Sequence, residues 1–120
     1  MQRLPPPSRP RCLLVDADDS FAQILAGIIT PHGFDIKILG EPFAALLELR
    51  ARRYDLVLFD LSSKDGDAAF VLDRVRTEMP AVLEHTVIVT TNPLVASEVS
   101  VGVPVIGKSD LAPLMRYLTL

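Results

Sequence analysis

The 120-residue sequence predicts one α/β domain with a parallel five-stranded sheet covered by helices on both faces. Two hydrophobic periods alternate along the chain, because short apolar runs are followed by segments in which apolar residues recur at helical spacing. The composition agrees, since 49% of the residues are hydrophobic and none is Trp, which indicates an aliphatic core. Strands that alternate with helices imply parallel pairing and right-handed crossovers.

The first half of the chain contains three expected strands. Residues 12–16 are apolar up to Asp16, and residues 56–59 are the most apolar run, so both are expected to be buried on both faces, the second at the centre of the sheet. Residues 34–38 alternate between apolar and polar, which indicates a half-buried strand.

Two helices are expected between these strands. Apolar residues from 21 to 29 recur at helical spacing, and Asp19 is the expected cap of that helix, with Asp18 pointing elsewhere. Pro42 suits the first turn of the second helix, which should end at a cluster of three arginines: Arg50, Arg52 and Arg53. That cluster is either a solvated helix end or a contact surface for an acidic partner.

The second half predicts a third helix that ends before Pro80, then strands over 87–89 and 103–106. The connection over 92–102 is barely long enough for a short helix. A last helix is expected around residues 111–118, capped by Ser109 or Asp110.

Four of the expected strands lead into one polar residue each: Asp16, Asp60, Thr90 and Lys108. In an open parallel sheet, ligands bind outside the carboxyl ends of the strands, so these four side chains are expected to meet at one edge. Two carboxylates, a hydroxyl and an ammonium suit the binding of a divalent cation and of a phosphoryl group.

In this order and spacing, the strand ends resemble a response-regulator receiver domain of two-component signalling. The segments that carry the resemblance are Leu-Leu-Val-Asp16, Asp-Leu-Val-Leu-Phe-Asp60-Leu, Val-Ile-Val-Thr90 and Val-Ile-Gly-Lys108, together with Asp65-Gly66. The resemblance implies a flavodoxin-like (βα)5 doubly wound sandwich with strand order 2-1-3-4-5. We expect residues 1–10 to be a disordered or extended Pro-rich lead-in, and 11–120 a stand-alone receiver domain without an output domain.

The same resemblance implies a chemistry for each residue. Asp60 would accept a phosphoryl group from a histidine kinase or phosphotransfer protein, with at most self-phosphorylation and self-dephosphorylation as enzyme activity. Mg²⁺ would be held by Asp16, Asp60 and the backbone carbonyl of Ser62. Lys108 would pair with Asp60 and then with the phosphoryl oxygens, and Thr90 would hydrogen-bond the phosphoryl group. A downstream protein would bind differently to the phosphorylated and unphosphorylated domain.

Each of these residues also has an ordinary structural interpretation. Asp60 could cap the turn after its strand, Thr90 suits a strand in any protein, and Lys108 could be a loop cation. Lys64, close to the site in sequence, could either stand in for part of the cation charge or face solvent.

The chain departs from the receiver pattern at several positions, which keeps a second interpretation open. Ala17 replaces the second acidic residue of the first strand end, which should weaken Mg²⁺ binding. Val105 replaces an aromatic residue that couples to Thr90, and Ser109 replaces a proline, so a cis peptide is not expected there. The alternative is therefore a pseudo-receiver, an interaction module that keeps the fold but is not phosphorylated.

Composition excludes several other classes of function. A net charge of -3 offers no basic face for nucleic acid, and no apolar run approaches the roughly 20 residues that span a bilayer, so no membrane partner is expected. Cys12 is the only cysteine, which fits a reducing, cytoplasmic location. A flavin- or nucleotide-binding protein is disfavoured because no glycine-rich phosphate loop is present. His32 and His85 receive no role.

Overall fold

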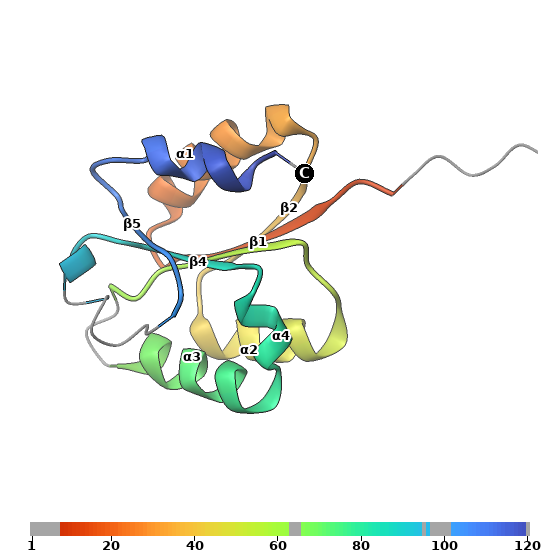
Figure 1. Cartoon of the computed structure of the whole chain (residues 1–120), viewed down its shortest axis with the longest axis vertical. Helices are drawn as coiled ribbons and strands as arrows, with labels where there is room; N and C mark the ends of the chain where they lie inside the picture. Colours follow the sequence, from red (N-terminus) through yellow and green to blue (C-terminus); the bar gives the residue numbers. More distant parts are fainter. Residues whose placement is uncertain (1–7, 63–65, 95, 97–101, 120) are drawn as a thin grey trace, which may run out of the picture.

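The structure, a computed structural model, describes residues 8–62, 66–94, 96 and 102–119. Five parallel strands form one sheet in the order β2-β1-β3-β4-β5, which confirms the predicted fold and strand order (Figure 1). The strands are β1 (Arg11–Val15), β2 (Asp35–Leu39), β3 (Leu56–Phe59), β4 (Thr86–Thr90) and β5 (Val105–Gly107). The apolar run of β3 thus lies at the centre of the sheet, where its four residues are all buried.

The helices cover both faces of the sheet. They are α1 (Asp19–Ile29), α2 (Pro42–Ala51), α3 (Asp67–Glu78) and α4 (Pro80–Leu83), with 3-10 helices η1 (Thr30–His32) and η2 (Ala112–Tyr117). In Figure 1, α1 and the C-terminal segment lie on one side of the sheet, and α2, α3 and α4 lie on the other. Right-handed crossovers between parallel strands produce this division.

Alternate residues of the strands serve two separate cores. In β1, Leu13 and Val15 pack in the cluster beneath α2 and α3, whereas Cys12 and Leu14 pack in the cluster beneath α1 and η2. Both sets are buried. The sheet therefore has no solvated face at its centre, which explains why its strands read as continuous apolar runs.

Two expectations about helix ends were wrong. Asp18, not Asp19, caps α1: its backbone is extended, and its carboxylate accepts a hydrogen bond from Phe21 N at 3.1 Å. Asp19 is already in the helix, because the strand ends at Val15 and leaves only three residues to reverse the chain. A side chain in the first helical turn lies past the position from which it could cap.

The last helix also differs from the expectation. Residues Ala112–Tyr117 form a 3-10 helix, and neither Ser109 nor Asp110 is its N-cap; Leu111 is, without a side-chain hydrogen bond. The Asp110 carboxylate accepts a hydrogen bond from Ala112 N at 3.3 Å. The segment is only six residues long, and short helical pieces commonly adopt the tighter 3-10 form.

The third helix ends before Pro80, as expected, but the short helix α4 that follows it was not predicted. The described peptide bonds are all trans, in agreement with the expectation for Ser109. Residues 1–7 of the lead-in, Lys64, Asp65 and most of the 92–102 connection lie outside the described residues.

Candidate functional site

The sheet itself brings the strand-end residues to one edge. Just past the strand ends, Asp16 N donates to Leu39 O at 3.0 Å, Asp60 N to Val15 O at 2.9 Å, and Lys108 N to Thr90 O at 2.8 Å. These bonds continue the ladder one residue beyond the assigned strands. The backbones of Asp16, Asp60 and Lys108 are therefore fixed along one edge of the sheet, at the carboxyl ends of β1, β3 and β5, with Thr90 of β4 between Asp60 and Lys108.

A single ammonium joins the two carboxylates. Lys108 Nζ lies 2.9 Å from Asp16 Oδ2 and 3.3 Å from Asp60 Oδ2. Only 3%, 9% and 11% of the side-chain surface of Asp16, Asp60 and Lys108 is exposed. The ring of Phe21, on α1, lies 4.5 Å from the same Nζ and adds a cation–π contact. The structure thus brings together three of the four strand-end residues as a buried ion triad.

Burial and pairing perturb the acid–base behaviour of this triad. Burial raises the pKa of Asp16, while its contacts with Lys108 and with the Asp18 backbone oppose that rise. Burial lowers the pKa of Lys108, but its close contact with Asp16 and the charge of Asp60 outweigh that effect, so the pKa of Lys108 is raised overall. Two carboxylates face one ammonium, which leaves the ionised triad with an excess negative charge.

The carboxylate oxygens of Asp16 and Asp60 supply some of the ligands that a divalent cation would need. Asp16 Oδ1 accepts from Asp18 N at 2.8 Å, and Asp60 Oδ1 from Ser62 N at 2.9 Å. Asp16 Oδ2 is buried and accepts no hydrogen bond from the described residues, although Lys108 Nζ lies 2.9 Å away as its ion-pair partner. A buried acceptor that receives no hydrogen bond suits a metal ligand.

The pocket above these oxygens measures about 520 Å³, and Ala17 and Ser62 line it beside both carboxylates. Within the described part of the chain, no three acidic, histidine or cysteine side chains are grouped closely enough to hold a metal. A bound Mg²⁺ would therefore depend on Asp16, Asp60, a backbone carbonyl and waters, because Ala17 supplies no carboxylate.

The fourth strand-end residue, Thr90, belongs to a separate group of hydroxyls. Its buried Oγ1 lies 3.0 Å from Ser62 Oγ, which also lies 3.1 Å from Thr91 Oγ1 and accepts from Thr91 N at 3.2 Å. The Ser62 hydroxyl is thus the centre of this group. The sequence analysis gave a role only to the Ser62 carbonyl and missed its hydroxyl. The presence of a serine two positions after Asp60 was the feature that could have indicated it.

Comparison with known proteins supports the same type of domain. No family model matches the chain. The DNA-binding response regulators MtrA of Mycolicibacterium smegmatis and Mycobacterium tuberculosis are each 43% identical over 53 residues. That stretch is 44% of this chain and 23% of each relative, so the match spans about a quarter of the relatives' length.

Solved structures match nearly the whole chain. A response regulator receiver protein from Pseudomonas putida has a TM-score of 0.77 at 23% identity, covering 93% of this chain and 97% of that one. A sensor protein from Polaromonas sp. JS666 reaches 0.79 at 23% identity, covering 92% and 94%. The response regulator TrrA from Thermotoga maritima, solved in complex with Mg²⁺–BeF, has 0.74 at 19% identity, covering 89% and 94%.

No helix in the described ranges is both long enough and apolar enough to cross a membrane. The structural matches extend over the sheet and helices, and the sequence match falls on proteins that are themselves response regulators. The chain therefore has the fold of response-regulator receiver domains, and over 53 residues its sequence is similar to that of response regulators.

Proposed function

We propose that Asp60 accepts a phosphoryl group from a histidine kinase or phosphotransfer protein of the cytoplasm, and that the change is read by a downstream protein. The observation that carries the proposal is the ion triad, in which Lys108 Nζ contacts both Asp16 and Asp60 at the carboxyl edge of the sheet. A carboxylate that lies beside an ammonium and lines an open pocket is placed to act as a nucleophile.

In this reaction, a carboxylate oxygen of Asp60 attacks phosphorus, the new O–P bond forms, and the bond from phosphorus to the donor breaks. The Lys108 ammonium can exchange its contact with Asp60 for a contact with the phosphoryl oxygens, where the negative charge then lies. The Ser62 N–H, bonded to Asp60 Oδ1 at 2.9 Å, orients the acceptor carboxylate. Mg²⁺, held by Asp16, Asp60 and the Ser62 carbonyl, would supply neutralisation of the approaching anions.

Thr90 requires a rearrangement before it can bind the phosphoryl group. Its hydroxyl is engaged by Ser62 Oγ at 3.0 Å, so a hydrogen bond to a phosphoryl oxygen competes with that contact. The exchange of one hydroxyl partner for a charged one is favourable, because hydrogen bonds to charged groups are the stronger ones. Phosphorylation would therefore change the contacts of the Ser62–Thr91 region, which a protein partner can detect.

The test is incubation with Mg²⁺ and acetyl phosphate, followed by intact-mass measurement. We expect the mass of one phosphoryl group to be added to the wild-type chain and to Asp73→Asn, in which an exposed acid of α3 is changed. Asp60→Asn should gain none. Modification that persists in Asp60→Asn would assign the acceptor to another residue.

A pseudo-receiver is the second candidate, and a specific observation favours it. Lys108 already provides a counter-charge to both carboxylates, and Ala17 lines the pocket where a third carboxylate would strengthen cation binding. The folded site can therefore exist without cation or phosphate. Failure of acetyl phosphate and of beryllofluoride to change the chain at millimolar Mg²⁺ would establish this alternative.

A further inference from the structure

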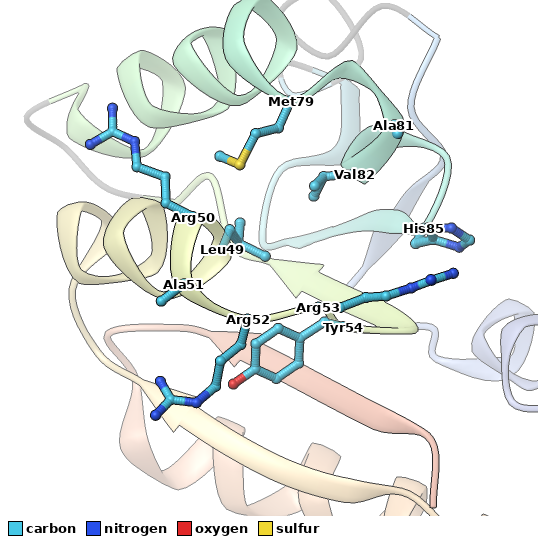
Figure 2. A pocket seen from close by; sticks show the side chains of 10 residues that line it. All are labelled: Leu49, Arg50, Ala51, Arg52, Arg53, Tyr54, Met79, Ala81, Val82 and His85. Atoms are coloured by element: carbon cyan, nitrogen blue, oxygen red, sulfur yellow. The ribbon is translucent and has the colours of Figure 1, made fainter. Parts of the chain in front are cut away.

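A second pocket lies at the opposite end of the sheet from Asp60. It measures about 600 Å³, and it is bounded by the end of α2 and by α4 (Figure 2). Tyr54, two residues before β3, and His85, directly before β4, line it, whereas Asp60 follows β3. The pocket is therefore at the amino ends of the strands, and it shares no lining residue with the pocket over the ion triad.

The lining of this pocket combines an apolar floor with a cationic edge. Leu49, Met79 and Val82 supply apolar surface, and Figure 2 shows Met79 and Val82 projecting from the α3–α4 side towards Leu49 of α2. The charged side chains of the lining are three arginines, Arg50, Arg52 and Arg53, and His85 adds an imidazole. A local excess of positive charge on a chain of net charge -3 indicates attraction for an anionic group at this place.

Two of the arginines are already paired within the domain. Arg50 donates to both carboxylate oxygens of Glu78, at 2.9 and 2.8 Å, and thereby ties α2 to α3. Arg52 contacts Glu48 at 3.3 Å. The interpretation of the arginine cluster as a solvated helix end is therefore incomplete, because these two side chains have structural partners.

Arg53 and His85 differ from the paired arginines. Both are exposed, and neither side chain forms an ion pair or hydrogen bond with the residues that the structure describes. In Figure 2 the Arg53 side chain extends away from Arg52 and Tyr54 towards His85, so that the guanidinium and the imidazole border the same side of the pocket. An anion placed there would meet a guanidinium whose donors are not already used by a carboxylate.

We propose that this pocket docks a peptide segment of a partner protein in which a Glu or Asp lies next to a large aliphatic side chain. The carboxylate would pair with Arg53 beside His85, and the aliphatic side chain would cover Leu49, Met79 and Val82. Charge complementarity selects an acidic segment. The apolar floor, in which Met79 and Val82 are half-buried and Leu49 is buried beneath them, supplies area that a surface ion pair alone does not. The docking surface is independent of Asp60 and of its phosphorylation.

The test uses the isotope-labelled chain and two blocked peptides, acetyl-Glu-Leu-Leu-Glu-amide and its twin with both Glu replaced by Gln. Millimolar acidic peptide should shift the amide resonances of Arg53, Val82 and His85, and the Gln twin should bind more weakly. Arg53→Gln should weaken binding of the acidic peptide about fivefold, equivalent to ~1 kcal/mol. Arg116→Gln removes the same charge from an exposed position on η2, on the other side of the sheet, and should leave binding unchanged.

A second variant separates docking from any effect on the fold. Ala81 is exposed at the start of α4, so Ala81→Glu places a carboxylate in the first helical turn, where it is tolerated. We expect this variant to fold and to lose binding of the acidic peptide. The proposal is refuted if the pocket resonances do not move, if both peptides bind equally, or if Arg116→Gln weakens binding as much as Arg53→Gln.

Discussion

Lys108→Met tests how far the stability of this domain depends on its ion triad. The change keeps an unbranched apolar stem but leaves Asp16 and Asp60, of which 3% and 9% is exposed, without their shared counter-charge. Removal of one partner of a buried ion pair costs about 3–5 kcal/mol. Because the three side chains line an open pocket that water can enter, we expect the lower end, about 3 kcal/mol at pH 7.

The pH dependence of this loss has a definite sign. The pKa of Asp16 in the folded wild-type chain is already raised by burial above its ordinary 3.8, and removal of the ammonium raises it further. A folded state that binds the proton more tightly than the unfolded state gains stability as the pH falls towards the unfolded pKa. The stability lost in Lys108→Met should therefore be regained on acidification from neutral pH towards pH 4.

A loss of stability with rising pH is also expected for the wild-type chain, at high pH. The pKa of Lys108 is raised in the folded state, so its contribution is fully present below the ordinary value of 10.5. That contribution is lost as the pH rises through the raised pKa, where the folded chain must give up its proton.

Urea unfolding followed by circular dichroism measures both effects. Asp16→Asn in the Lys108→Met background removes one uncompensated carboxylate and should restore much of the lost stability at pH 7. Lys37→Met serves as the control, because Lys37 also pairs with a glutamate at 3.0 Å but is 46% exposed, and its loss should cost less. A Lys108→Met chain as stable as wild type at pH 7, or one that Asp16→Asn destabilises further, would refute the reasoning.

Other changes test separate parts of the structure. Asp18→Ala should cost about 1 kcal/mol in urea unfolding by removing the α1 cap, and Asp19→Ala should cost clearly less; equal losses would contradict the assignment. Ala17→Asp should raise Mg²⁺ affinity at least about tenfold in an NMR titration, since added ligand charge strengthens such sites. Ser62→Ala should prolong the life of phosphorylated Asp60 about threefold in a mass-based decay assay, because the Thr90 hydroxyl loses its competing partner. Cys12 is buried and its pKa is raised to about 12, so a thiol reagent at pH 8 should label it only when urea unfolds the chain.

The features that sequence reasoning predicted correctly share one physical basis, which is the hydrophobic period. The continuous apolar runs of β1 and β3 reflect burial on both faces, and such a run can be recognised from neighbouring residues in the sequence. The position of Asp16, Asp60 and Lys108 directly after such runs then follows from the parallel sheet. Local errors arose where one residue decided the outcome, as for Asp18, since Asp18 and Asp19 are equally good caps in composition.

Apart from the contact between Lys108 and Asp60, which the receiver resemblance implied, the side-chain partners could not be predicted from the sequence. Ser62 and Thr90 are 28 residues apart, and so are Arg50 and Glu78, and their contacts depend on how two crossovers place their elements. The aliphatic patterning and the order of polar residues at the strand ends determined the receiver fold and the candidate site from the sequence alone. Which oxygen Lys108 contacts, which hydroxyl holds Thr90 and which arginine stays unpaired were decided only by the tertiary structure, because these contacts join side chains that chain proximity does not bring together.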